Sequence, residues 1–225
     1  MRIPTNKLIK AIKSKSYSER WFAAEILGTK KTLNKHQIRE ISREMMTSDV
    51  GEVLCWGLGQ MKNKNYISKI GKLLEYRDNY FKCRAADALT NISNSEAIGT
   101  LEFYLKKSKF SETRWRCAVA LGEIGDIHSF DSLWNSAQDK DKYVRWKSIW
   151  ALSLLKGNLE KRIREKILDE GTSEYMLWRC LWVLGRIGNR GTGSWLNNIN
   201  WANKHKSKYI DFQLQLTLAA INNKL

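Results

Sequence analysis

A leucine recurs at nearly constant intervals along this chain, each time at the end of a short alanine-rich stretch. We name these residues the anchor leucines: Leu27, Leu58, Leu89, Leu121, Leu152, Leu184 and Leu218. Successive anchors are 31, 31, 32, 31, 32 and 34 residues apart, which is too regular for chance and too short for an independent domain. Each interval is therefore predicted to be one repeat, and the repeats should stack in a line and bury their apolar sides against one another.

Each repeat is predicted to contain two antiparallel helices. The anchor lies in the second helix, where the residues four before it and three after it share its face and should form the core. Another amphipathic segment precedes each such helix, as at residues 159–168, and no segment has a credible strand pattern. We therefore expect an all-α fold, a right-handed α-solenoid of about seven two-helix repeats, in which residues 1–225 form a single domain.

Capping residues indicate where the second helices begin. Asp141 stands eleven residues before its anchor and can accept a hydrogen bond from the first turn of the helix. Equivalent positions in five other repeats also hold capping residues: Ser16, Thr47, Asp78, Ser173 and Ser207. The string GNRGTG at residues 188–193 is instead expected to be a flexible turn between helices and not a phosphate-binding loop, because no strand precedes it.

Three strings carry a family resemblance: TRWRCAVALGEIGD at 113–126, VRWKSIWAL at 144–152 and LWRCLWVLGRIG at 177–188. They resemble HEAT repeats of the short, phycobilisome-lyase-like type, and the resemblance covers nearly the whole chain. It is weakest in the second repeat, where Gly51 replaces a basic residue, and in the seventh, which lacks the arginine. The resemblance implies that the second helix of each repeat lines the concave side of a superhelix.

The charge of the chain narrows the range of partners. Lysine and arginine total 39 against 23 aspartate and glutamate, a formal net charge of +16, which favours polyanions such as DNA, RNA or an acidic protein surface. No apolar run approaches the length of a membrane span, so we expect no membrane contact and a cytoplasmic location. The three histidines have no neighbouring carboxylate at metal-ligand spacing, so neither a metal nor any other cofactor is expected.

A helical wheel at 100° per residue places five positions of each second helix opposite its anchor: nine, six, five and two residues before it, and two after it. We name these positions the groove rows. Seven of the ten tryptophans occupy two of these rows, and basic residues occupy a third. The residues expected to bind nucleic acid are Trp21, Trp56, Arg84, Trp115, Arg116, Trp146, Lys147, Trp150, Trp178, Arg179, Trp182 and Arg186. Tyrosines occupy the row nine before the anchor: Tyr80, Tyr143, Tyr175 and Tyr209.

Alternating rings and cations suit a nucleic acid, because bases can stack on the rings while the cations neutralise phosphates. A second interpretation is that the tryptophans fill the seams between repeats; on the wheel, Trp56, Trp150 and Trp182 lie nearer to solvent than the others. Basic residues seven before the anchor, such as Arg114, point inward and are expected to tie repeats together. The leading hypothesis is a non-enzymatic module that binds nucleic acid through phosphate contacts and stacking, with DNA favoured over RNA and RNA left open.

Two other functions stay open. The chain resembles the HEAT-like alkylpurine DNA glycosylases in size, charge and groove chemistry, and that resemblance implies a catalytic carboxylate beside aromatic surfaces. The candidates are Asp87, two residues before its anchor, and Glu25, one turn after Trp21; each could instead be a solvated or arginine-paired acid. The third hypothesis is a protein-interaction scaffold in which the same tryptophans and arginines bind an acidic partner.

Overall fold

The chain is described by a computed structural model that covers residues 3–30, 33–44, 50–76, 78–201, 205 and 207–223. The first helices of the repeats are α1 (Thr5–Ile12), α3 (Lys35–Glu44), α5 (Ile67–Leu73), α7 (Ser95–Lys107), α9 (Phe130–Ser136), α11 (Leu159–Leu168) and α13 (Arg190–Asn197). The second helices are α2 (Tyr17–Gly28), α4 (Gly51–Gln60), α6 (Asn79–Ile92), α8 (Ser111–Ile124), α10 (Lys142–Leu152), α12 (Glu174–Ile187) and α14 (Lys208–Asn222). Short 3-10 helices precede α5 and α9, at Lys64–Tyr66 and Ile127–Ser129. The predicted all-α solenoid of two-helix repeats is confirmed.

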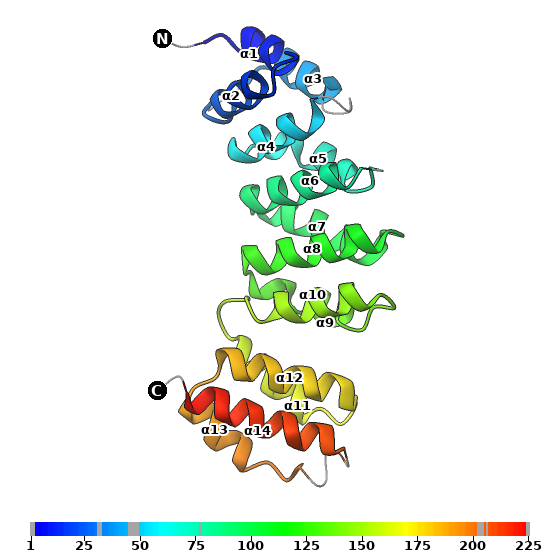
Figure 1. The fold of residues 1–225 in the computed structure, drawn as a ribbon, viewed down its shortest axis with the longest axis vertical. Helices are drawn as coiled ribbons and strands as arrows, with labels where there is room; N and C mark the ends of the chain where they lie inside the picture. The colour runs from blue at the N-terminus through cyan, green and yellow to red at the C-terminus, as the bar shows by residue number, and fades with distance from the viewer. Residues whose placement is uncertain are drawn as a thin grey trace.

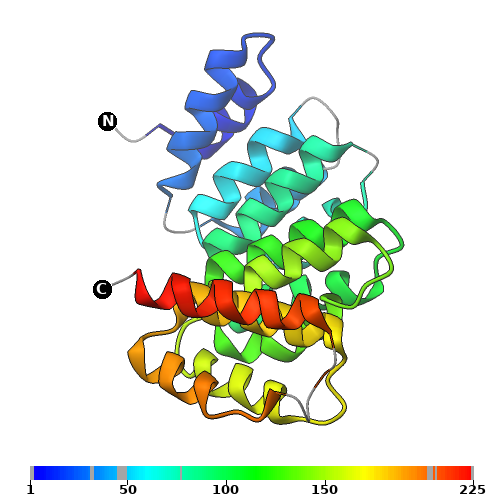
Figure 2. The same ribbon diagram turned by 60° about the horizontal axis from the view of Figure 1, so that its bottom comes forward.

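The helices form two layers that run along one elongated stack (Figure 1). The second helices make one layer, which we name the inner helices, and the first helices make the other, as the pairs α12 with α11 and α14 with α13 show clearly in Figure 2. Along most of the stack, neighbouring inner helices pack more closely than neighbouring outer helices. The inner helices therefore lie on the shorter, concave side of the stack.

The anchor leucines form the centre of the core, as predicted. Six of the seven are fully buried, and Leu218 on α14 is half-buried. The predicted caps are confirmed where the side chain accepts a backbone N–H at the start of an inner helix: Ser16, Asp78, Asp141 and Ser173. Ser207 precedes α14 without such a bond, and Thr47 lies outside the described residues.

Glycine after the anchor allows inner helices to touch backbone to backbone. A Cβ atom built on Gly59 would lie 2.6 Å from the Cα of Ala88, and one built on Gly122 would lie 2.6 Å from the Cα of Ala151. Real Cβ atoms need about 3.5 Å or more, so neither position accepts a larger residue without separating the helices. Ser153, directly after the end of α10, takes this position, and α10 and α12 contact each other less than the other neighbouring inner helices do.

The expectation of a flexible turn at residues 188–193 is wrong from residue 190 onward, because α13 begins at Arg190. Asn189 caps this helix: its side chain accepts the Thr192 N–H, and the Thr192 hydroxyl accepts the Asn189 N–H. This reciprocal pair satisfies two donors at the helix start. This pair outweighs the poor helix propensity of the glycines that follow. One of them, Gly193, lies close to the side chain of Ile221 on α14.

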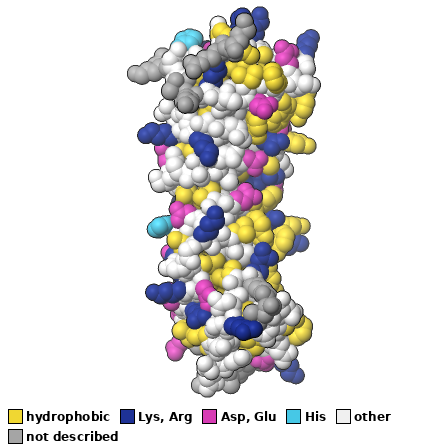
Figure 3. Space-filling model, turned by 90° about the vertical axis from the view of Figure 1, so that its left-hand side faces the viewer, with side chains coloured by type: hydrophobic (Ala, Val, Ile, Leu, Met, Phe, Trp, Pro, Cys, Tyr) yellow, Lys and Arg dark blue, Asp and Glu magenta, His cyan; other side chains and the backbone are white. Residues whose placement is uncertain are grey.

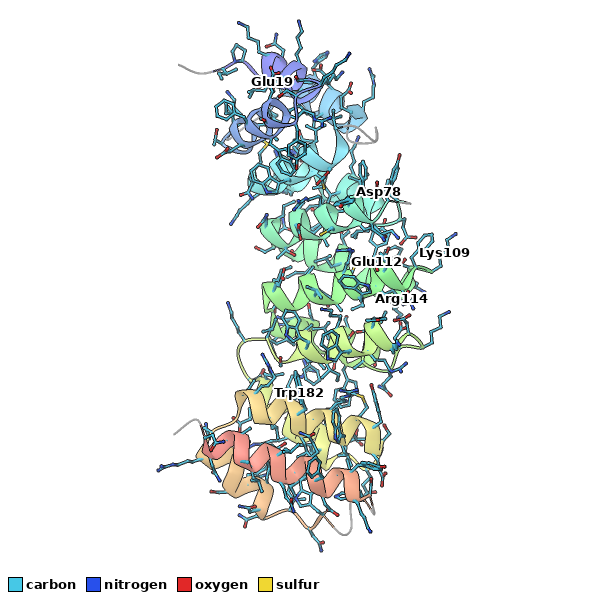
Figure 4. The ribbon with its side chains drawn as sticks, in the orientation of Figure 1. Glu19, Asp78, Lys109, Glu112, Arg114 and Trp182 are labelled. Carbon is cyan, nitrogen blue, oxygen red and sulfur yellow. The ribbon has the colours of Figure 1, made fainter. Side chains whose placement is uncertain are left out.

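The buried basic row behaves as the sequence predicts. Arg114 is 5% exposed and donates two hydrogen bonds to the Asp139 carboxylate, at 2.7 and 2.9 Å. A third bond runs to the carbonyl of Ser108 at 3.0 Å. Arg114 therefore connects α8 to the loop before α10 and is not available to a ligand (Figure 4).

Candidate nucleic-acid interface

The groove rows lie on a surface that solvent reaches. None of the seven tryptophans in these rows is buried, and Trp146 is the most open at 50% exposed. In Figure 3, hydrophobic and basic side chains gather along the right-hand edge, which is the side that faces the viewer in Figure 1 and carries the inner helices. Five of these tryptophans also pack against the core: Trp21, Trp56, Trp150, Trp178 and Trp182. The rings thus fill seams between repeats and still present part of their surface to the groove.

The order of exposure expected from the wheel is wrong for Trp146. It belongs to the row predicted to lie deeper, yet it is more exposed than Trp150 and Trp182. In the preceding repeat the equivalent ring, Trp115, has the ammonium of Lys147 from the next inner helix 5.7 Å from its centre. The corresponding cation of α12, Arg179, lies over rings of its own helix, and α10 and α12 make few contacts. Arg179 therefore does not cover Trp146 as Lys147 covers Trp115.

Cations lie over aromatic rings in the C-terminal repeats. The Lys147 ammonium is 4.6 Å from the centre of the Trp146 ring, and the Arg179 guanidinium is 4.4 Å from Trp178. Within the described part of the chain, neither cation has an ion pair. We name this set the C-terminal aromatic face: Trp146, Lys147, Trp150, Trp178, Arg179, Trp182 and Arg186.

The C-terminal aromatic face spans the junction between α10 and α12. Figure 4 labels Trp182 on the side of α12 that faces α10. The Arg186 guanidinium lies 5.1 Å from the centre of the Trp182 ring and its Nε donates to the hydroxyl of Ser153 across the junction, at 3.1 Å. Arg186 therefore links α12 to the end of α10.

The basic residues of the N-terminal half are paired with carboxylates. Arg84 lies 3.2 Å from Glu52 on α4 and 3.3 Å from Asp87 on its own helix. Arg116 lies 2.7 Å from Glu112, which also accepts the Trp115 indole N–H at 2.8 Å. Both predicted phosphate contacts in this half thus have their charge compensated within the protein.

The groove row nine residues before the anchor differs between the N-terminal and C-terminal halves of the groove. Arg116 and Arg179 occupy the same row and each covers the tryptophan before it, at 4.5 and 4.4 Å. Four residues earlier stands Glu112 in one repeat and Tyr175 in the other, and the tyrosine hydroxyl accepts from Arg179 at 3.3 Å. A carboxylate at this position neutralises the arginine, whereas a phenol leaves its charge in place.

The N-terminal aromatic pair packs on itself. Trp21 and Trp56 meet edge to face with ring centres 5.5 Å apart, and Arg84 lies 5.4 Å from the Trp21 ring. Edge-to-face contact uses part of both rings in stabilising the first two repeats. Less of this indole surface is free to stack on a ligand than at Trp146.

The two carboxylates predicted as catalytic candidates lie in different surroundings. Asp87 borders a pocket of about 270 Å³ with Trp56, Arg84 and Glu123, while Glu25 is exposed on α2. Partial burial, together with the negative charge of Asp87, raises the pKa of Glu123. The sequence analysis missed Glu123, although it stands two residues after its anchor and so on a groove row.

Acidic residues on the groove rows are confined to the first four repeats. Where these rows are described, they hold Glu25, Glu52, Asp87, Glu112 and Glu123. The same rows of α10, α12 and α14, all of which are described, hold no carboxylate and carry Lys147, Arg179 and Arg186. The groove is therefore divided into an N-terminal part with internally paired charges and a C-terminal part with a net positive charge.

A metal centre finds no support in the described part of the chain, where no group of three or more histidine, cysteine, aspartate or glutamate side chains could hold an ion. Likewise, none of the helices within the described residues is both long and apolar enough to cross a membrane.

No protein-family model and no curated protein matches the sequence. Among solved structures, the complex of CpcE and CpcF of phycocyanin lyase from Nostoc sp. PCC7120 aligns over 98% of this chain and 96% of its own, at 15% identity and a TM-score of 0.48. Human deoxyhypusine hydroxylase in complex with glycerol aligns over 97% and 96%, at 13% identity and 0.43. A designed armadillo repeat protein in complex with the peptide (KR)4 aligns over 98% and 100%, at 16% identity and 0.40. All three likenesses are of the fold alone, at TM-scores below 0.5.

Proposed function

We propose that this chain is a non-enzymatic binding module that holds a nucleic acid strand, DNA in the first instance, against the C-terminal aromatic face. The observation that carries the proposal is the pairing of Lys147 and Arg179 with tryptophan rings where no carboxylate shares the groove rows. Bases stacked on aromatic side chains contribute about 1–3 kcal/mol each. Cations beside those rings are placed to neutralise the phosphates that flank a stacked base.

The proposal does not depend on the total charge of the chain. A net charge of +16 attracts any polyanion to any part of the surface, and salt weakens that attraction everywhere. In the N-terminal half of the groove, Arg84 and Arg116 already pair with carboxylates. A ligand would have to displace these carboxylates, so the C-terminal half is the favoured site.

The test compares two double variants that remove the same charge from different places. Lys147→Gln with Arg179→Gln removes two cations from the C-terminal aromatic face, and Arg84→Gln with Arg116→Gln removes two from the paired half. Binding of a fluorescein-labelled DNA strand, and of RNA of the same sequence, is followed by anisotropy across a salt series. We expect the first variant to weaken DNA binding about tenfold and to make the log–log salt slope less steep by about 1.4, or 0.7 for each lost phosphate contact.

The paired-half variant is the control for diffuse electrostatics, and it should bind nearly as tightly as the wild type. Equal weakening by both variants would overturn the proposed site. Failure of the wild type to bind either nucleic acid would overturn the function itself and would favour an acidic protein as the partner.

Tryptophan replacements add a test of stacking. Trp146→Ala removes the ring that is 50% exposed, and it should weaken binding with little change in thermal stability. Trp150 and Trp182 also pack against the core, so their alanine variants should lose stability as well as affinity. Unchanged affinity in Trp146→Ala would contradict the stacking part of the proposal.

The glycosylase hypothesis is the weaker one, because Asp87 accepts a hydrogen bond from Arg84 at 3.3 Å and so resembles an arginine-paired acid. Its direct test is incubation with alkylated DNA and detection of released base. Release that is abolished by Asp87→Asn would replace the non-enzymatic proposal with an enzymatic one.

A further inference from the structure

A pocket of about 430 Å³ opens between α12 and α14, close to the ends at which both helices begin. We name it the α12–α14 pocket. Its walls include three aromatic rings, Tyr175, Trp178 and Tyr209, and the guanidinium of Arg179. Trp178 and Arg179 also belong to the C-terminal aromatic face, so the pocket continues the groove toward the last repeat. Its volume falls within the range of small-molecule sites.

Two of the rings are available to a ligand. Tyr209 is 81% exposed and Tyr175 is 40% exposed, and the Arg179 guanidinium lies 5.0 Å from the centre of the Tyr175 ring and 4.4 Å from that of Trp178. Exposed aromatic rings on either side of an open pocket offer stacking surfaces to a flat ring. The planar guanidinium is itself a surface on which a base can stack.

Two charged side chains line the pocket, the Glu174 carboxylate and the Arg179 guanidinium. Arg179 has no ion pair with a described residue, and its buried Nε has no hydrogen-bond partner there. Its guanidinium already lies over the Tyr175 and Trp178 rings, so these rings do not form an open cage for an ammonium ligand. A planar ring that carries hydrogen-bond acceptors and is attached to a phosphate satisfies both the rings and the guanidinium.

We propose that the α12–α14 pocket receives an unstacked base, so that the ligand class of this protein is single-stranded nucleic acid. The inference rests on the proposed function and narrows it. A base in a duplex is paired and stacked, and extruding it costs a few kcal/mol. A single strand presents its bases without that cost, so the pocket favours the single strand over a duplex of the same sequence.

The test uses Tyr209→Ala with Tyr80→Ala as a matched control. Both tyrosines are the second residue of an inner helix, and they are 81% and 71% exposed, but Tyr80 lies on α6, far from the pocket. Neither replacement should destabilise the fold. The probes are a labelled oligothymidylate strand, a strand of equal length that lacks bases, and a duplex.

For the oligothymidylate strand, we expect Tyr209→Ala to raise the dissociation constant about tenfold and Tyr80→Ala to leave it unchanged. The strand without bases and the duplex should bind more weakly than oligothymidylate and should not respond to Tyr209→Ala. Equal affinity of the two tyrosine variants for oligothymidylate would overturn the pocket. If Lys147→Gln with Arg179→Gln still weakened binding in that case, the proposed function would stand without it. Wild-type protein that binds none of the three probes would overturn both.

Discussion

The contact between inner helices can be tested with one methyl group. At Gly122 a Cβ would lie 2.6 Å from the Cα and 2.7 Å from the Cβ of Ala151. Both neighbouring atoms belong to or adjoin the backbone of α10, so no side-chain rotation relieves the overlap. Gly122→Ala therefore requires α8 and α10 to separate by about 1 Å at this point, because carbon atoms are in favourable contact only near 3.5–4.0 Å.

The magnitude follows from two opposing terms. Overpacking of a tight contact costs about 1–3 kcal/mol, and replacing a helical glycine by alanine returns about 1 kcal/mol through backbone entropy and helix propensity. The expected net change for Gly122→Ala is a loss of about 1–2 kcal/mol. Gly185 stands at the same position after its anchor, but there the nearest atom to a built Cβ is 3.6 Å away. Gly185→Ala should therefore stabilise the protein by about 0.5–1 kcal/mol.

Thermal denaturation followed by circular dichroism at 222 nm compares the two variants directly. For a chain of this length, 1 kcal/mol corresponds to about 2–4 °C in the midpoint, so the two midpoints should differ by several degrees in opposite directions from the wild type. Gly99→Ala, on α7 with no atom within 4 Å of the built Cβ, measures the propensity gain alone. A Gly122→Ala protein as stable as Gly185→Ala would mean that α8 and α10 do not touch at this point.

Two further predictions concern charged groups. Glu112→Tyr should release Arg116 from its ion pair and tighten binding of a DNA strand by roughly threefold in the anisotropy assay, while Glu102→Gln on outer helix α7, with the same change in charge, should not. Burial alone would raise the pKa of Asp139, but hydrogen bonds from Arg114 and the backbone hold that pKa below its usual value. Asp139→Asn should cost about 3–5 kcal/mol at neutral pH by breaking a buried pair. Because the carboxylate stabilises the fold only while ionised, urea titrations should show this difference shrinking as pH falls below about 4, and a constant difference from pH 7 to pH 2 would contradict the assignment.

The sequence predicts the parts of this molecule that depend on one helix at a time. The anchor spacing of about 31 residues, the caps and the inward direction of Arg114 follow from helical geometry alone, and the structure confirms them. The start of α13 was missed because a reciprocal cap between Asn189 and Thr192 outweighs the glycines that follow it. A search for an Asn followed three residues later by Thr would have found this start.

Contacts between repeats could not be predicted in the same way. The exposure of Trp146 depends on how far α10 lies from α12, and no period within a helix encodes that distance. The pairing of Arg84 with Glu52 joins two helices 32 residues apart in the chain. The acidic residues were nevertheless visible in the groove rows, and recording both signs of charge there would have revealed the divided groove.

The divided groove explains how a uniform repeat can make a local site. The inner helices α8, α10 and α12 each supply a tryptophan six residues and a cation five residues before the anchor, so repetition alone would extend a binding surface over all three. Carboxylates at Glu52, Asp87 and Glu112 close that surface by pairing the cations of α6 and α8. The proposed site is therefore set by where acids are absent: α10 and α12 have Tyr143 and Tyr175 where α8 has Glu112. A polyanion of limited length would then bind at one end of the stack even though the repeat itself extends beyond it.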